Sequence, residues 1–186
     1  MKNLLALSAI ILLMSIPVSA WTSSAALDDS AVLSAIMQDR CASSANNPDG
    51  RYQVVPAEAD EIEVQSFPKS FDAGAVKSLI SRNKTTHPLP RIELCSSFKR
   101  VSSAKVATFF APNNGAATGW RGFYRAFPGA QGISSLSLPG YSKGGKLAIV
   151  QVSSSCGEMC SSGFYWVLRK VHGKWVVYKS SPAWVS

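Results

Sequence analysis

The chain has 186 residues, of which 46% are hydrophobic and 10% aromatic, and its formal net charge at pH 7 is +8. This content of apolar side chains is enough to build a core and excludes a wholly disordered chain. Residues 1–20 combine Lys2, an apolar run and the small residues Ser19 and Ala20, which is typical of a cleaved secretory signal. No other apolar run is long enough to cross a bilayer, so we expect no transmembrane segment after signal removal.

The residue after the predicted cleavage point is Trp21, where a lipid-anchored protein would need a cysteine. We therefore expect a periplasmic or secreted protein without a lipid anchor. The short, compact signal favours a bacterial source.

Charge is unevenly distributed along residues 21–186, which we expect to form a single domain. Residues 21–63 carry eight carboxylates and two arginines, a net charge of −6, whereas residues 64–186 carry a net charge of +13. This division can create a basic face for an anionic partner, or the acidic segment can pack against the basic remainder. We favour the intramolecular interpretation, and we expect no nucleic-acid partner for an exported chain.

Four cysteines follow the predicted signal: Cys41, Cys95, Cys156 and Cys160. In an oxidising compartment an even number favours two disulfides, for which three pairings exist. The simplest pairing joins the neighbours in the sequence, Cys41 with Cys95 and Cys156 with Cys160. The second pair would shape a loop, because its spacing is unlike that of a redox dithiol or a zinc site. We predict no metal.

The first half of the chain is predicted to contain helices and short strands. Asp28 or Asp29 can cap a helix over residues 27–40, whose apolar side chains recur with a period of 3.6. A second helix, capped by Ser70, should end near Asn83, with an acid early and bases late as the helix dipole favours. The pattern also predicts strands over residues 51–55, 61–67 and 91–95, and a short helix over residues 102–110.

Four aromatic residues recur with helical spacing in the middle of the chain. Trp120, Phe123, Tyr124 and Phe127 occupy positions i, i+3, i+4 and i+7, which is one face of two helical turns. Such a stripe can form a ligand platform, but we predict that it packs in the core, because burying these rings gains a large hydrophobic free energy.

Beyond Ile133 the pattern changes from helical to strand-like. The predicted strands cover residues 134–138, 146–153, 163–171 and 174–179, and they are connected in part by the cysteine loop and by a two-residue turn at 172–173. We therefore predict an α+β domain with a C-terminal antiparallel β-meander and with helices packed on one face of the sheet.

The turn before this meander contains short matches to two enzyme motifs. Residues 140–144 fit the G-x-S-x-G of hydrolases, and residues 140–146 resemble a phosphate-binding P-loop. Both motifs require a strand before them and a helix after them, whereas residues 147–152 are strand-like. We therefore predict a glycine-rich turn here and assign no catalytic residue.

A meander would bring five cations and a histidine together at the end opposite the cysteine loop. These residues are Lys143, Lys146, Arg169, Lys170, His172 and Lys174. We call this set the basic end. It is a candidate anion-recognition surface for an envelope protein or an anionic envelope polymer, and the alternative is a solvated sheet edge that resists aggregation.

Residues 120–178 carry further short motifs, among them Phe-Pro-Gly at 127–129, Leu-Ser-Leu-Pro-Gly-Tyr at 136–141 and Gly-Lys-Trp at 173–175. In these motifs the chain resembles a loosely defined group of uncharacterised exported bacterial proteins with an aromatic helix and a C-terminal Gly-x-Trp β-meander. The resemblance implies an α+β fold and bacterial export, and it carries over no catalytic residue.

The sequence offers no nucleophile, base and orienting group that form a catalytic set, and no cofactor is implied. We therefore expect a non-enzymatic binding or accessory module of the envelope or the secreted fraction. The alternatives are a hydrolase-type enzyme whose site joins His87 or His172 to a carboxylate in space, and a purely structural envelope protein. A concave pocket that joins a histidine to a carboxylate would favour the enzyme.

Overall fold

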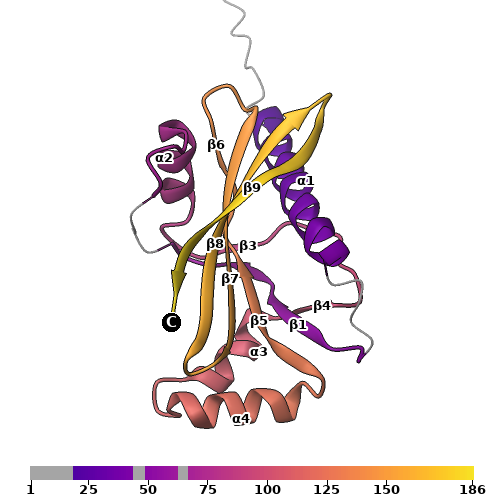
Figure 1. Ribbon diagram of the computed structural model, residues 1–186, viewed down its shortest axis with the longest axis vertical. Helices are drawn as coiled ribbons and strands as arrows, with labels where there is room; N and C mark the ends of the chain where they lie inside the picture. Colours follow the sequence, from indigo (N-terminus) through magenta and orange to yellow (C-terminus); the bar gives the residue numbers. More distant parts are fainter. Residues whose placement is uncertain (1–18, 44–48, 63–66) are drawn as a thin grey trace, which may run out of the picture.

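A mixed β-sheet runs the length of the molecule (Figure 1). The computed structural model describes residues 19–43, 49–62 and 67–186, with side chains from residue 28 onward. Among these residues, seven strands form the main sheet in the order β4-β1-β5-β7-β8-β9, with β6 also paired to β7. The strands are β1 (Tyr52–Pro56), β4 (Phe98–Val101), β5 (Ala130–Leu136), β6 (Gly140–Tyr141), β7 (Leu147–Gly157), β8 (Cys160–Val171) and β9 (Lys174–Val185).

The two halves of this sheet differ in direction. Strands β7, β8 and β9 form an antiparallel meander, which confirms the α+β fold with a C-terminal antiparallel sheet. Strand β1 instead pairs in parallel with both β4 and β5, which the sequence did not predict. A separate antiparallel pair joins β2 (Glu58–Ala59) to β3 (His87–Pro88).

Two of the predicted strands are corrected by the structure. Residues 61, 62 and 67 lie outside any strand, and residues 63–66 of that prediction lie outside the described residues. Residues 91–95 also form no strand. The Ser34 hydroxyl accepts a hydrogen bond from the Glu93 amide at 3.1 Å, and the Ser30 hydroxyl donates to the Arg91 carbonyl. These bonds attach the segment to a helix, and the strand forms further on, as β4.

The helices are α1 (Ser19–Ser43), α2 (Ala73–Arg82), α3 (Ser103–Ala107), the 3₁₀ turn η1 (Thr108–Phe110) and α4 (Ala116–Ala126). Helix α1 begins before the predicted start, so Asp28 and Asp29 lie within it and do not cap it. The predicted cap Ser70 is also wrong. Asp72 caps α2 by accepting a hydrogen bond from the Ala75 amide at 2.8 Å, and the helix ends at Arg82 with Asn83 as its C-cap, near the predicted end.

The helices cover both faces of the sheet. Val150 and Val152 of β7 pack with α1, whereas Ile149 between them packs with α2. Neighbouring residues of a strand point to opposite faces, so α1 and α2 lie on opposite sides. Helices α3 and α4 share the face of α2, because Ile133 in their cluster pairs with Ser155 of β7. The prediction that helices pack on one face therefore holds for α2, α3 and α4 and not for α1.

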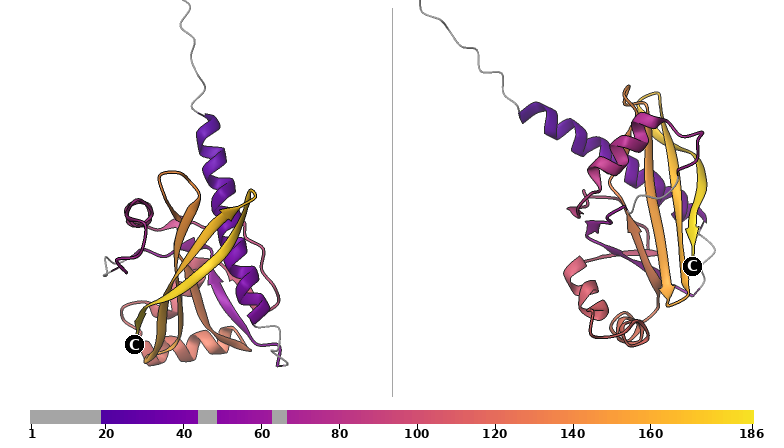
Figure 2. Two further views of the ribbon diagram at one scale, coloured as in Figure 1. Left: turned by 45° about the horizontal axis from the view of Figure 1, so that its top comes forward. Right: turned by 90° about the vertical axis from the view of Figure 1, so that its left-hand side faces the viewer.

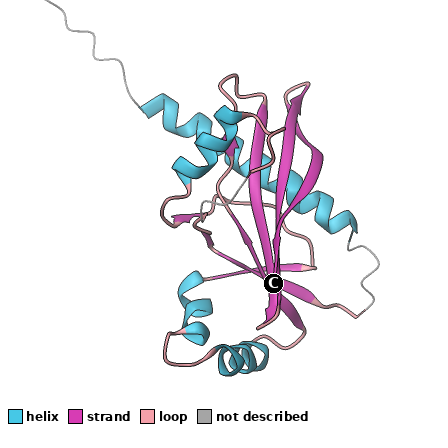
Figure 3. Ribbon diagram, turned by 60° about the vertical axis from the view of Figure 1, so that its left-hand side comes forward, coloured by secondary structure: helices cyan, strands magenta, loops and turns pink. Residues whose placement is uncertain are grey.

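The views show how these layers are arranged along the sheet. Helices α1 and α2 flank the end that carries the β8–β9 turn, and α4 closes the other end (Figures 1 and 3). The first turns of α1 project beyond the sheet (Figure 2). As predicted, the aromatic face of α4 packs in the core: Phe123 and Phe127 are buried, and Trp120 and Tyr124 are half-buried.

The cysteines pair in the simplest of the three predicted arrangements. Cys41 at the end of α1 bonds Cys95 before β4, with 6.1 Å between their Cα atoms, and Cys156 bonds Cys160 across the β7–β8 turn, with 5.2 Å. Most of the predicted signal, residues 1–18, lies outside the described residues. Within the described ranges, no helix is long and apolar enough to cross a membrane.

Two neighbouring carboxylates of α1 pair with cations from the basic part of the chain. Asp28 accepts hydrogen bonds from Lys170 at 2.9 Å and from the Trp175 indole at 3.3 Å. The buried Asp29 accepts bonds at 2.9 and 2.7 Å from the two terminal nitrogens of Arg82, and one at 2.8 Å from the Tyr141 hydroxyl. These pairs support the intramolecular interpretation of the uneven charge.

Replacing Asp29 should destabilise the fold through this buried pair. Asp29→Asn removes the charge that compensates Arg82. We expect the free energy of unfolding to fall by about 3 kcal/mol. This value is at the low end for a broken buried pair, because Arg82 keeps some solvent contact. Urea denaturation measures this loss. Asp39→Asn, at an exposed position on the same helix, should change stability by less than about 0.5 kcal/mol. Equal losses would show that Asp29 has no special role.

The two glycines of the G-x-S-x-G match should behave differently. A Cβ at Gly140 would overlap the backbone of α2 at Ala75 and Leu79, whereas a Cβ at Gly144 would meet no atom within 4 Å. We expect Gly140→Ala to destabilise the protein by about 3 kcal/mol through overpacking, and Gly144→Ala to change stability by less than about 0.5 kcal/mol. Thermal or urea unfolding compares them. A similar effect of both changes would contradict the packing role of Gly140.

Candidate functional site

A pocket of about 470 Å³ lies on the sheet face that carries α2, α3 and α4. Its floor is formed by β5, β7 and β8, and its walls come from β2, α3, η1, α4 and the β7–β8 turn. We call it the acidic pocket, because the carboxylates of Glu58, Asp60 and Glu158 line it. Its volume is within the range of ordinary small-molecule sites.

The floor of the acidic pocket is rich in hydroxyl groups. Ser135, Ser155 and Ser161 line it, and the Ser161 hydroxyl donates to that of Ser155 at 3.0 Å. Ser155 and Ser161 are directly opposite each other in the β7–β8 pair. Their side chains therefore point to the same face, where their uncharged hydroxyls can donate and accept hydrogen bonds.

An aromatic wall stands beside this floor. Phe110 of η1 and Trp120 of α4 are in edge-to-face contact, with 5.0 Å between ring centroids and 67° between ring planes. Both side chains are half-buried and line the pocket. The stripe predicted as core packing thus has one residue, Trp120, that also faces a cavity. Aromatic faces of this kind can contact apolar groups or cations.

Three carboxylates complete the lining: Glu58, Asp60 and Glu158. Glu58 and Asp60 lie on either side of the buried Ala59, so they point away from the core. The Glu58 amide donates to the Ser103 hydroxyl of α3 at 2.9 Å, and the Asp60 amide donates to the Leu136 carbonyl at 2.9 Å. These bonds fix the backbone on one side of the pocket.

Glu158 reaches the pocket from the disulfide ring at the opposite side. The ring closes between Cys156 and Cys160, and the Tyr124 hydroxyl of α4 donates to the Cys156 carbonyl at 2.8 Å. The ring and this bond together hold the turn against α4. The disulfide, predicted to shape a loop, therefore positions a carboxylate of the candidate site.

The protein environment changes the ionisation of Asp60. Although the residue keeps solvent contact, burial of its carboxyl raises the pKa above the ordinary aspartate value. Hydrogen bonds from Ser153, at 3.2 Å, and from Ser135 lower the pKa in part, and the nearby charge of Glu61 raises it. A carboxyl with a raised pKa in a pocket is a marker of functional sites.

The charge of the acidic pocket is opposite to that of the chain as a whole. The sequence has 19 Lys and Arg residues against 11 Asp and Glu. Among the described residues, three carboxylates line the pocket and no Lys, Arg or His does. Three like charges around a hollow create a local negative potential, which attracts cations and repels anions.

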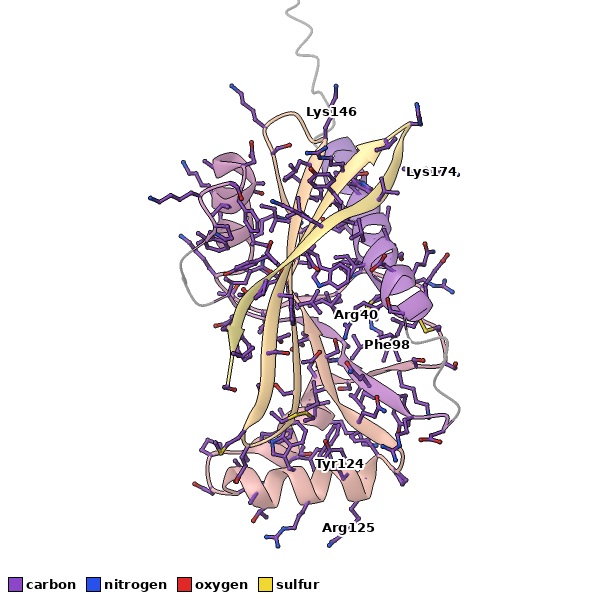
Figure 4. All side chains as sticks on the ribbon, in the orientation of Figure 1. Arg40, Phe98, Tyr124, Arg125, Lys146 and Lys174 are labelled. Carbon is purple, nitrogen blue, oxygen red and sulfur yellow. A yellow bond between two sulfur atoms is a disulfide. The ribbon has the colours of Figure 1, made fainter. Side chains whose placement is uncertain are left out.

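The structure places the predicted basic end as follows. Leu147 pairs with Arg169, and the Lys170 amide donates to the Lys146 carbonyl at 2.9 Å, so the β6–β7 and β8–β9 turns lie side by side. Lys146 and Lys174 both project at this end (Figure 4).

Two of the six residues of the basic end interact within the chain. Lys170 pairs with Asp28, and the Arg169 guanidinium lies 3.5 Å from the centroid of the Tyr178 ring. The exposed members are Lys143, Lys146, Arg169, His172 and Lys174. Anion recognition by the basic end stays a prediction.

The residues of the hydrolase alternative do not meet at the pocket. In the described part of the chain, neither His87 nor His172 lines it. His172 lies in the β8–β9 turn, and Ser142 accepts a hydrogen bond from the Leu147 amide at 3.2 Å within the β6–β7 turn. Residues 140–146 are followed by a strand, as the prediction of a glycine-rich turn required. The described residues also contain no group of three or more His, Cys, Asp and Glu that could hold a metal.

Sequence analysis missed all three carboxylates of the acidic pocket. They come from two segments that are far apart in the sequence, and their approach depends on the parallel pairing of β1 with β5, which no local pattern predicts. One local signal was present: Glu158 lies inside the short ring that Cys156 and Cys160 close, and it is exposed.

No family model, no curated protein and no solved structure matches the chain. The resemblance to exported bacterial proteins therefore stays a prediction. The geometry of the acidic pocket is the basis for assigning a function.

The pKa of Asp60 should respond to the hydroxyl next to it. Ser153→Ala removes a hydrogen bond to the carboxylate, so the pKa of Asp60 should rise further, as measured by a carboxyl ¹³C NMR titration. Ser154→Ala, on the opposite face next to Arg40, should leave it unchanged. An unchanged or lowered pKa in Ser153→Ala would contradict this.

The free energy of unfolding should also depend on the ionisation of Asp60. Because the folded state holds the Asp60 proton more tightly than the unfolded state does, this residue's contribution to the free energy of unfolding should fall as pH rises through the window between the ordinary and the raised pKa.

Proposed function

We propose that the protein is a non-enzymatic binding module that takes a small organic cation with an apolar part into the acidic pocket. The observation that carries this proposal is the lining of three carboxylates, Glu58, Asp60 and Glu158, without a cationic side chain among the described residues. The proposal names a ligand class and no particular compound.

Each part of the pocket suits one part of such a ligand. An ammonium group loses water on entering a pocket, and carboxylates replace that hydration by charge-assisted hydrogen bonds. Hydroxyls of the serine floor accept further N–H bonds, and the Phe110–Trp120 corner provides an apolar surface for the rest of the ligand. Cation–π contact with an aromatic ring adds about 0.5–2 kcal/mol.

A binding function fits the pocket better than catalysis does. The catalytic alternative joins a histidine to a carboxylate, and among the described residues neither His87 nor His172 lines the pocket. The raised pKa of Asp60 makes ligand binding sensitive to pH, because only the ionised carboxylate attracts a cation.

The predicted export is consistent with this role. Two disulfides fit an oxidising compartment such as the periplasm or the external medium.

Charge selection is tested with 2-phenylethylammonium, which has an ammonium group on an aromatic tail. We expect calorimetric titration to show binding that is at least about tenfold, or about 1.4 kcal/mol, weaker in Asp60→Asn/Glu158→Gln, because two of the three attracting charges are lost. Binding should also weaken as pH falls through the raised pKa of Asp60 and as salt increases.

The control has the same change in net charge at exposed positions outside the pocket, Asp39→Asn/Glu93→Gln. It should bind 2-phenylethylammonium like the unmodified protein. The neutral analogue 2-phenylethanol should bind the unmodified protein far more weakly than 2-phenylethylammonium does. Equal binding of amine and alcohol, or equal losses in both double variants, would contradict the proposed function.

A further inference from the structure

Helix α2 has a second, outward side that the sheet does not cover. Ala75 and Leu79 are fully buried against the sheet. Val76 and Ile80, half-buried on another side of the helix, line a groove of about 560 Å³ together with Pro68 and Phe71. The floor of this groove is apolar, and it is distinct from the acidic pocket, with which it shares no lining residue.

Three exposed lysines surround the groove: Lys69, Lys77 and Lys84. Among the described residues no carboxylate lines it, and none of these lysines takes part in an ion pair. Asp72, which lies between Lys69 and Lys77 in the sequence, caps α2 and accepts a hydrogen bond from the Ala75 amide. We call this feature the lysine-rimmed groove.

Helix electrostatics alone do not account for these lysines. Lys84 follows the C-terminal end of α2, where the helix dipole favours a cation, but Lys69 precedes the N-terminal end, where the dipole disfavours one. A further cation, Lys179, lies with its ammonium 5.3 Å from the centroid of the Phe71 ring. Helix polarity therefore accounts for Lys84 but not for Lys69.

We propose that the lysine-rimmed groove binds a long-chain carboxylate. Its alkyl chain lies on the apolar floor formed by Phe71, Val76 and Ile80, and its carboxylate pairs with the lysine ammonium groups. Charge complementarity selects an anionic head, because no carboxylate among the described lining residues opposes it. Lysine stems also cover part of the chain, since their methylene groups are apolar.

The test uses dodecanoate below its critical micelle concentration. Isothermal titration should show one site per chain, and Lys77→Ala/Lys84→Ala should bind at least about tenfold more weakly. The control Arg121→Ala/Arg125→Ala loses the same net charge at exposed positions of α4, outside the groove, and should bind dodecanoate as the unmodified protein does. Val76→Thr, which keeps the side-chain volume, should weaken dodecanoate binding through the added hydroxyl on the floor.

Four results would overturn the proposal. They are no binding of monomeric dodecanoate, equal losses in the groove and control double variants, equally tight binding of dodecyltrimethylammonium when the acidic pocket carries Asp60→Asn/Glu158→Gln, and binding that occurs only to vesicles of anionic phospholipid. The last result would assign this side of α2 to a membrane surface. Because 2-phenylethylammonium binding depends on other residues, failure here leaves the acidic pocket unaffected.

Discussion

The buried carboxylate of Asp29 holds α1, α2 and β6 together. Strands β5 and β6 pair with successive parts of β7, so at the level of β6 the described sheet has an edge. Arg82 of α2 reaches around this edge and donates a hydrogen bond to Asp29 of α1. Asp29 also accepts a hydrogen bond from the Tyr141 hydroxyl of β6. One charged group thereby fixes two helices on opposite faces. Together with the burial of Ala75 and Leu79, this bond contributes to the position of α2, whose outer side carries the lysine-rimmed groove.

The two sheet faces are used differently. On the face of α1, even the polar groups are taken up in packing: Arg40 donates hydrogen bonds to Ser134 and Gln53 and lies over the Phe98 ring (Figure 4), and its burial lowers its pKa to about 10. On the other face, α2 and α4 cover the two ends of the sheet. The serine-rich stretch between them stays open to form the acidic pocket.

The sequence predicted the parts of the fold that local patterns determine. The alternating side chains of β8 and the helical spacing of the aromatic residues of α4 follow directly from which side of each element is buried. Both elements are present in the structure as predicted. The parallel β4-β1-β5 pairing is set by contacts between distant segments, and so is the loss of the strand at 91–95 to hydrogen bonds from α1. The acidic pocket escaped prediction for the same reason, since the segments of Asp60 and Glu158 come to line one pocket only through that pairing.

The net charge of the chain is a poor guide to the ligand of such a site. Charges further apart than about 8–10 Å are largely screened at physiological ionic strength, so the nearest groups dominate the potential inside a pocket. Glu58, Asp60 and Glu158 are those groups for the acidic pocket, while the lysines lie on other surfaces. A chain with a formal charge of +8 can therefore present a cation site and an anion site at once. Outside these two sites, ion pairs such as Asp28 with Lys170 neutralise part of the charge.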